Sequence, residues 1–419
     1  MHVAIPVLDE PDWLPKCLAS LEAQRNAAFD VWVCVNQPDT WWEAPEHRAV
    51  CERNAETLAW LRTARELDLR ILDRTSRGNG WPRGKGGVGR ARKVLMDTIS
   101  EEAADDDLIV SLDADTLVEP DYLSVLAATF RARPDMLGLA VPYFHKLTGD
   151  LTIDRAILRY EIYLRHYAVN LWRIRSPYAF TAMGSGLVFP VRAYRRVGGM
   201  PPRVSGEDFY FLQKLVKNGR VLHWCEATVY PSARVSARVA FGTGPALQKG
   251  TTGDWEAYPI FAAELFDEIA ETVARFRDLH ARTVDTPLSA FLGRQLKTDD
   301  PWATLRRNHS DPARFVRACH ERLDGLRIFQ YLRAARRNRP PVPDETALFA
   351  SLRRHYLKRA RREAAQNEHA RTVLALLESE QSSAWRFGSA PPAQLDAVRC
   401  FLAGIENHDR RAHARACRL

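Results

Sequence analysis

Cysteine is scarce in this sequence, and the few cysteines are scattered. The 419 residues include seven cysteines, an odd number, and no two of them form a C-x-x-C pair. Disulfide frameworks and cysteine-based zinc sites depend on paired or closely spaced cysteines. The sequence therefore argues against both, and it suits a reducing compartment such as the cytosol.

Long apolar runs are also missing. No apolar stretch reaches the roughly 20 residues with which an α-helix spans a bilayer. The first residues pass from one apolar segment directly to Asp9 and Glu10, so they lack the basic-then-apolar order of a signal peptide. We expect a cytoplasmic protein, with peripheral contact on the inner face of the membrane as an open alternative.

Positively charged residues are in modest excess over negatively charged ones. The formal net charge is +8, while hydrophobic residues make up 46% and charged residues 27% of the sequence, as in ordinary globular proteins. A positive surplus suits an acidic partner, such as a nucleotide phosphate or an anionic membrane surface. A solvated basic surface explains it equally well, and nucleic acid is the disfavoured partner.

Strand-like and helix-like segments alternate through the first 250 residues. Apolar runs predict strands at residues 3–8, 29–36, 69–72, 108–112, 138–142 and, as one or two strands, 221–230. Helical spacing predicts intervening helices, among them 46–66, 91–102, 121–131 and 207–219. This alternation predicts an α/β fold with a doubly wound, mostly parallel sheet. From about residue 257 only helical spacing remains, which predicts an all-helical C-terminal domain at 257–419.

Two carboxylates follow one of the predicted strands. Asp113 and Asp115 come directly after the apolar run at 108–112. Open α/β sheets bind ligands at the carboxyl ends of their strands. Carboxylate oxygens and substrate phosphate oxygens are the ligands that Mg²⁺ or Mn²⁺ takes, so the pair predicts a cation site. Two solvated aspartates in a turn are the alternative.

A glycine- and arginine-rich segment occupies residues 74–92. Its G-x-G-x-x-G at 84–89 does not follow a strand by a tight turn, and Lys85 is followed by glycine, so neither a dinucleotide fingerprint nor a P-loop is favoured. Accessible backbone N–H groups beside Lys85 and Arg92 suit a diphosphate. A basic loop without a ligand is the alternative. Arg234 and Arg238, in a later segment that resembles a mobile lid, are further candidate phosphate ligands.

Glu207 and Asp208 open a predicted helix. Acidic residues in a first helical turn are favoured by the helix dipole, so capping alone explains them. The functional interpretation is that a carboxylate at the rim of the site accepts the proton of an attacking hydroxyl group.

In their order, these features resemble the family 2 glycosyltransferases with the GT-A fold, over roughly residues 1–245. The resemblance rests on the opening Ile5–Leu21, the segment Gly89–Lys93, the D-x-D at 113–115, Gly198-Gly199 and Glu207-Asp208. It implies a GT-A domain at 1–250, with a nucleotide-binding half at 1–116 and an acceptor half at 117–250.

The resemblance also implies a nucleotide-diphosphate-sugar donor, a hydroxyl acceptor and a divalent cation, Mg²⁺ or Mn²⁺. Asp115 would hold the metal together with Asp113, which would also touch the donor. Asp208, with Glu207 beside it, would be the general base of an inverting displacement. The residues expected to contact the nucleotide-sugar are Pro6, Asp9, Glu10, Asn36, Lys85, Arg92, Asp113, Arg234 and Arg238.

Two alternatives stay open at this point. A retaining transferase of the mannosylglycerate synthase type also joins a D-x-D domain to a helical tail, and it would not need Asp208 as a base. A non-catalytic protein of the same fold would instead use the basic helix around residues 353–362 to bind a membrane or nucleic acid.

Overall fold

The chain folds into two compact units. A computed structural model describes residues 1–64, 66–236, 242–379 and 384–416. Unit 1 contains the described residues of Met1–Ile157, Phe180–Thr252 and Asn407–Leu419, and unit 2 contains those of Leu158–Ala179 and Gly253–Glu406. Two long helices, α5 (Leu151–Arg173) and α17 (Pro392–Ala416), contribute residues to both units.

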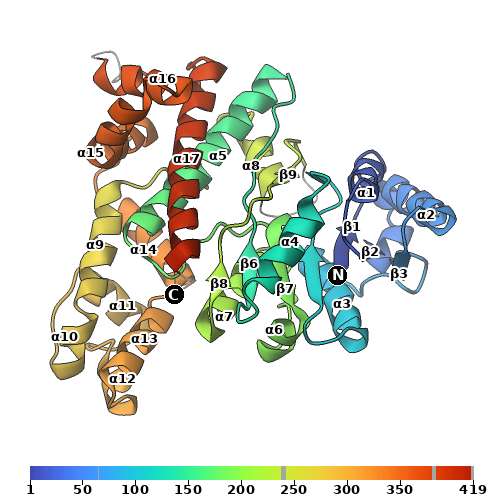
Figure 1. Ribbon diagram of the computed structural model, residues 1–419, viewed down its shortest axis with the longest axis horizontal. Coiled ribbons are helices and arrows are strands. Elements are labelled where there is room, and N and C mark those ends of the chain that lie inside the picture. Colours follow the sequence, from blue (N-terminus) through green and yellow to red (C-terminus); the bar gives the residue numbers. More distant parts are fainter. Residues whose placement is uncertain (65, 237–241, 380–383, 417–419) are drawn as a thin grey trace. The chain divides into compact units, whose positions relative to one another are not determined.

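Unit 1 is built on a seven-stranded sheet with the strand order β3-β2-β1-β4-β7-β6-β8 (Figure 1). The pairs β3/β2, β2/β1, β1/β4 and β6/β8 are parallel, whereas β7 runs antiparallel to β4 and β6. The prediction of a mostly parallel α/β sheet is confirmed. The strands are β1 (His2–Val7), β2 (Asp30–Asn36), β3 (Leu69–Arg74), β4 (Leu108–Ser111), β6 (Gly138–Ala140), β7 (Leu187–Pro190) and β8 (Val221–Leu222).

The central strands are buried on both faces, which explains their uninterrupted apolar sequences. Every residue of β4 is buried, as is every residue of β1 and β2 after the first. Helix α3 packs against β1 and β2, α2 against β2 and β3, and α6 against β7. The helices of this unit, apart from the two shared ones, are α1 (Leu14–Glu22), α2 (Arg48–Thr63), α3 (Val88–Glu102), α4 (Tyr122–Arg131), α6 (Val191–Arg196), α7 (Glu207–Asn218) and α8 (Thr243–Gly250).

A second, two-stranded sheet lies beside the D-x-D. Its strand β9 overlaps the one or two strands predicted at 221–230, whereas β5 and the pairing of the two strands were not predicted from the sequence. Strand β5 (Thr116–Val118) pairs antiparallel with β9 (Val229–Pro231), with Thr116 opposite Pro231. This register brings the residues after β9 alongside those before β5. The Ser232 N–H accordingly donates a hydrogen bond of 3.1 Å to the carbonyl oxygen of Asp115.

Unit 2 is helical, and no strand follows Pro231 in the part of the chain that the structure describes. The predicted helical character of the C-terminal region is therefore confirmed, while the predicted boundaries at 250 and 257 stay predictions. Among the described helices, none combines the length and apolar content needed to cross a membrane. The helices that belong wholly to this unit are α9 (Ala263–Ala274), α10 (Phe276–Ala281), α11 (Ser289–Leu296), α12 (Ala303–Asn308), α13 (Pro312–Arg322), α14 (Gly325–Arg337), α15 (Asp344–Glu363) and α16 (Glu368–Glu378).

Buried ion pairs tie α5 to α17 inside unit 2. Arg165 donates to Glu161 Oε1 at 2.6 Å and to Glu406 Oε2 at 2.8 Å. Arg399 adds a longer contact of 3.5 Å to Glu161. Charges removed from water are tolerated only when they are paired, so these side chains fix how the two helices meet within the unit.

Candidate active site

The site is organised by the edge of the sheet at which β1, β2 and β4 end. Because these three strands are mutually parallel, the residues that follow them lie along one edge. Glu10 follows β1, Asn36 ends β2, and Asp113 follows β4. The D-x-D thus lies where the sequence predicted it, between the buried strand β4 and the short strand β5.

Arg92 joins the D-x-D to helix α7. This arginine lies on α3, and its guanidinium donates through Nη2 to Asp113 Oδ1 and through Nη1 to Glu207 Oε1. The side chains of Arg92 and Glu207 are only 4% and 2% exposed, whereas that of Asp113 is 34% exposed. Three elements that are remote in sequence are therefore held together by one buried cation.

Burial and charge oppose each other in this cluster. Burial raises the pKa of Glu207 to about 7, although the positive charge of Arg92 acts in the opposite direction. Burial alone would lower the pKa of Arg92, but the carboxylates of Asp113 and Glu207 outweigh it and hold that pKa above its ordinary value. Arg92 is therefore a permanent positive charge at the centre of the site.

Two glycines make room for this ion pair. A Cβ atom on Gly184 would overlap the guanidinium of Arg92, and one on Gly89 would overlap the carbonyl oxygen of Arg203. The same Cβ on Gly89 would lie 3.0 Å from Cβ of Glu207. This role cannot be recognised in the sequence, because a glycine that allows close packing looks the same locally as a glycine in a turn.

Arg234 forms a second bridge, between Asp115 and Glu10. Its Nε lies 3.0 Å and its Nη2 2.9 Å from Asp115 Oδ2, and Nη2 also donates to Glu10 Oε1. The hydroxyl of Ser232 donates to the same Asp115 oxygen at 2.8 Å. The predicted phosphate ligand Arg234 thus pairs with two carboxylates, and the other predicted lid arginine, Arg238, lies outside the described residues.

Asp9, predicted beside the nucleotide, is engaged by the protein itself. Its carboxylate accepts from Arg53 Nε at 2.6 Å and from Arg53 Nη2 at 2.8 Å. Its backbone has a φ of +57°, and its N–H donates to Asn54 Oδ1 at 2.9 Å. These contacts fix the turn after β1, which puts Glu10 opposite Arg234.

Asn36, predicted beside the base, is buried and is 4% exposed. Its amide nitrogen donates to the carbonyl oxygen of Val7 at 2.7 Å, and its amide oxygen accepts from Trp81 Nε1 at 2.9 Å. Asn36 therefore anchors the glycine- and arginine-rich segment to the end of β2. The structure explains Asn36 and Asp9 through protein contacts, and a direct contact with the nucleotide stays a prediction for both.

The remaining predicted residues differ in accessibility. Pro6 is buried within β1, opposite Cys34 of β2, whereas Lys85 is exposed in the loop that precedes α3. Asp208 is half-buried beside Glu207, and its Oδ1 accepts the N–H of Phe209 at 2.7 Å. The charge of Asp208 contributes to the raised pKa of Arg92, so it lies within electrostatic reach of the cluster.

A protein-family model matches the part of the chain that holds most of these residues. Residues 108–249 match the family model described as glycosyl transferase family group 2, and the match spans the D-x-D, Glu207-Asp208 and Arg234. The chain carries a family 2 glycosyltransferase segment. It is identified as a glycosyltransferase on this match, which confirms the family predicted from the sequence motifs.

Solved glycosyltransferase structures resemble this chain only at low sequence identity and low TM-score. The 1–349 segment of TarS from S. aureus, in complex with UDP-GlcNAc, is 13% identical, with a TM-score of 0.40 and coverage of 81% of this chain and 92% of that one. The mannosyltransferase PcManGT from Pyrobaculum calidifontis, in complex with GDP-Man and Mn²⁺, is 17% identical, with a TM-score of 0.37 and coverage of 97% and 86%. GalNAc-T7 with UDP, GalNAc and Mn²⁺ is 10% identical, with a TM-score of 0.35 and coverage of 74% and 56%. No curated protein matches the chain.

The donor atoms of the glycosyltransferase segment suit a hard cation that binds together with a phosphate. No cluster of three or more His, Cys, Asp or Glu side chains suited to a metal ion occurs among the described residues. Mg²⁺ is commonly bound by only one or two carboxylates and completes its shell with water and substrate phosphate oxygens. Asp115 and Asp113 supply carboxylates of this kind, so the residues fit the predicted cation.

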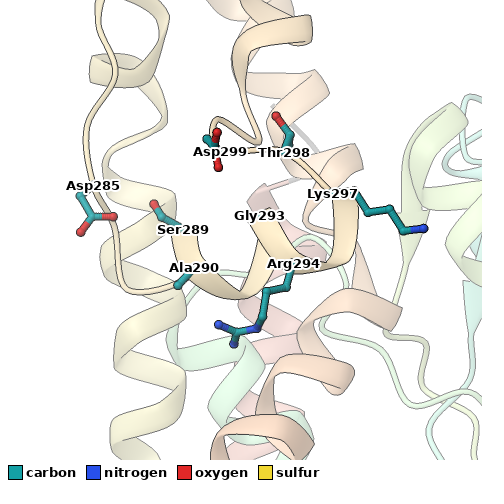
Figure 2. A pocket seen from close by; sticks show the side chains of 8 residues that line it. All are labelled: Asp285, Ser289, Ala290, Gly293, Arg294, Lys297, Thr298 and Asp299. Carbon is teal, nitrogen blue, oxygen red and sulfur yellow. The ribbon is translucent and has the colours of Figure 1, made fainter.

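A hollow of about 600 Å³ lies outside this segment, around α11 of unit 2 (Figure 2). Exposed side chains of both signs line it, namely Asp285, Arg294, Lys297 and Asp299. It contains none of the predicted site residues, and its charges are those of an ordinary solvated surface. The candidate active site is therefore the cluster at the edge of the sheet.

Proposed function

We propose that this glycosyltransferase moves a sugar from a nucleotide-diphosphate-sugar donor to a hydroxyl acceptor, with inversion and with the help of Mg²⁺ or Mn²⁺. The observation that carries the proposal is the convergence of the D-x-D, Arg92, Arg234 and the Glu207-Asp208 pair at one edge of the sheet. All of these residues except Arg92 lie within the matched segment 108–249. A diphosphate leaving group needs positive charge, and a hydroxyl nucleophile needs a base. The cluster contains both kinds of group.

In this proposal Asp208 is the general base. It takes the proton of the acceptor hydroxyl while the acceptor oxygen bonds to the anomeric carbon and the bond from that carbon to the diphosphate oxygen breaks. A divalent cation bound at Asp115 would supply charge neutralisation for the departing nucleoside diphosphate. Arg92 fixes the orientation of Asp113, because the guanidinium holds one carboxylate oxygen.

Glu207 contributes through Arg92 in this scheme. Its carboxylate is 2% exposed and is bonded to Arg92, so it holds that guanidinium in line with Asp113. Asp208 is only half-buried, whereas Glu207 is buried and bonded to Arg92. Asp208 is therefore the acid that an acceptor hydroxyl can reach.

Three arginines of the basic helix α15 have partners within unit 2. Arg353 donates to the carbonyl oxygen of Leu377, and Arg361 pairs with Glu378 at 2.9 Å. Arg354 pairs with Glu264 at 3.1 Å. These three cations are used within unit 2, as expected for a solvated helical face.

The proposal is tested by nucleotide release across UDP-, GDP- and dTDP-sugars, with Mn²⁺, with Mg²⁺ and with a chelator. Wild type is compared with Asp115→Asn and with Asp135→Asn, whose aspartate is exposed and lies 3.7 Å from Arg220. The proposal is supported if the protein releases nucleotide from one donor only in the presence of metal, and if this activity survives in Asp135→Asn but is lost in Asp115→Asn. Equal turnover by Asp115→Asn, or no donor binding at all, would overturn the proposal.

The stereochemistry tests the role of Asp208. An inverted anomeric centre in the product, observed by proton NMR, together with a loss in kcat of about 100-fold or more in Asp208→Asn, supports general-base catalysis. A retained configuration would favour the retaining alternative and remove the need for this base.

A further inference from the structure

Arg234 already occupies one carboxylate oxygen of Asp115, the residue that would hold the cation. Two of its nitrogens approach Asp115 Oδ2, at 3.0 and 2.9 Å, and one of these also donates to Glu10 Oε1. The three side chains are partly shielded from water, with exposed fractions of 24% for Arg234, 23% for Asp115 and 11% for Glu10. The guanidinium therefore neutralises two neighbouring carboxylates that would otherwise repel each other.

The contact is built by the register of the chain. The pairing of β5 with β9 sets Thr116 opposite Pro231, which aligns residues 232–234 with Asp115. The turn after β1, fixed by the bidentate pair of Asp9 with Arg53, holds Glu10 on the other side. The guanidinium also lies 5.9 Å from the ring centroid of Trp13. The paired strands β5 and β9 and the turn after β1 together hold the guanidinium of Arg234 between Glu10 and Asp115.

A divalent cation held through Asp115 Oδ2 would compete with Arg234 for that oxygen. Asp115 Oδ2 already accepts from Ser232 and from two nitrogens of Arg234, so a cation can bind that oxygen only if the guanidinium withdraws. A positive charge left beside the bound cation would also repel it. The withdrawn guanidinium finds new acceptors on a diphosphate, whose oxygens match its planar fork.

We propose that Arg234 is a resident counter-cation that occupies the position between Glu10 and Asp115 until a divalent cation and a diphosphate together displace it onto the diphosphate. This inference rests on the proposed function and deepens it, because it makes the binding of the cation and of the nucleotide interdependent. Cation alone binds weakly, since it must displace Arg234 with no phosphate to receive it. Such coupling between two ligands is reciprocal.

The test measures the two ligands separately. Free Mn²⁺ is followed by electron paramagnetic resonance during titration of the protein without nucleotide, and the affinity for UDP and GDP is then measured by calorimetry with saturating Mn²⁺. The proteins are wild type, Arg234→Met, Arg234→Lys and Arg48→Met. The last variant makes the same change in charge at an exposed pair of α2, where Arg48 lies 2.9 Å from Glu52.

The expected changes have opposite signs. Without nucleotide, Arg234→Met should bind Mn²⁺ at least about tenfold more tightly than wild type, because the charged hydrogen bonds of Arg234 to the carboxylates no longer have to be broken. With saturating Mn²⁺, it should bind the nucleotide about tenfold more weakly, because the charged hydrogen bonds of Arg234 to the diphosphate are lost. Arg234→Lys falls between, because an ammonium group cannot donate to both carboxylates as a planar fork. Arg48→Met stays within about twofold of wild type for both ligands. Circular dichroism of each variant monitors folding, and Arg234→Lys alone carries the test if Arg234→Met does not fold.

Three results overturn the inference, and they are distinguishable. If wild type turns over a donor with Mn²⁺ but the Arg234 variants show no gain in affinity for Mn²⁺ alone, the counter-cation role fails while the proposed function stands. If neither wild type nor the variants bind Mn²⁺, with or without nucleotide, both fail. A loss of affinity for both ligands in Arg234→Met also contradicts the inference, because it would make Arg234 a support of the cation site and not a competitor.

Discussion

Replacing Arg92 by methionine should destabilise the protein by about 3 kcal/mol, because it leaves a buried carboxylate without its partner. Glu207 is 2% exposed, and burial already raises its pKa to about 7 beside Arg92. Without the guanidinium its carboxyl group must either take up a proton or stay charged, and in both cases it is buried without its partner. Breaking one buried pair typically costs about 3–5 kcal/mol. The second pair adds little, since Asp113 is 34% exposed and water can replace the lost contact. The lower end of that range is therefore the expected value.

The assay is urea unfolding followed by tryptophan fluorescence, applied to a double-mutant cycle. The cycle contains Arg92→Met, Glu207→Gln and the double variant. Because the double variant removes both charges, it should recover part of the loss, with a coupling energy of about 1–3 kcal/mol. Arg70→Met is the matched control, since Arg70 forms an exposed pair with Glu102 at 3.6 Å, and it should cost at most about 1 kcal/mol.

A small loss of stability in Arg92→Met would refute a buried-cation role for Arg92. If Arg92→Met and Arg70→Met lose the same stability, the guanidinium of Arg92 does not act as a buried cation. A coupling energy near zero between Arg92 and Glu207 would also refute it, because two charges that stabilise each other must show a coupling energy.

Three other outcomes are expected. Gly184→Ala should cost about 1–3 kcal/mol in urea unfolding, because its Cβ would displace the guanidinium of Arg92, whereas Gly388→Ala, which has open space at the same position, should not. His166 has its pKa lowered by burial to about 3 from an ordinary 6.5, so the unfolded state binds the proton more readily and stability is lost as pH falls below 6.5. Between pH 7.5 and 5, His166→Gln should therefore lose about 2 kcal/mol less than wild type, and equal losses would contradict the assignment. Asp311→Ala should cost about 1 kcal/mol in the same assay, because Asp311 Oδ1 accepts a hydrogen bond of 2.8 Å from the backbone N–H of Arg314 at the start of α13. An unchanged stability would show that this cap contributes nothing.

Most of the main sheet was predictable because its central strands are buried on both faces, although β7 was not among the predicted strands. The run predicted as a strand at 108–112 is observed at Leu108–Ser111, and the run at 29–36 is observed at Asp30–Asn36. Strand β5 differs, since it has only three residues and is defined by its pairing with β9 more than by its own sequence. Three residues are too few to establish an alternating or continuous apolar pattern.

The chemistry of the site was predictable where it is local, and its pairings were not. The D-x-D and Glu207-Asp208 are contiguous motifs that follow a strand or open a helix, so their positions follow from the predicted elements. Arg92 and Glu207 are 115 residues apart, and Arg234 and Glu10 are 224 apart. Such partners are chosen by the strand order and by β5–β9 pairing, which no local pattern contains.

Asp9 and Glu10 show how backbone geometry separates two adjacent acids that look equivalent in sequence. The φ of +57° at Asp9 is one that aspartate tolerates better than most residues with a side chain. This conformation directs Asp9 to Arg53, and the next residue, Glu10, reaches Arg234 with its longer side chain. Exchanging the two acids would put the less tolerant residue in the strained position and the shorter one opposite Arg234. The order of the pair, and not only its charge, therefore determines how the turn after β1 supports the site.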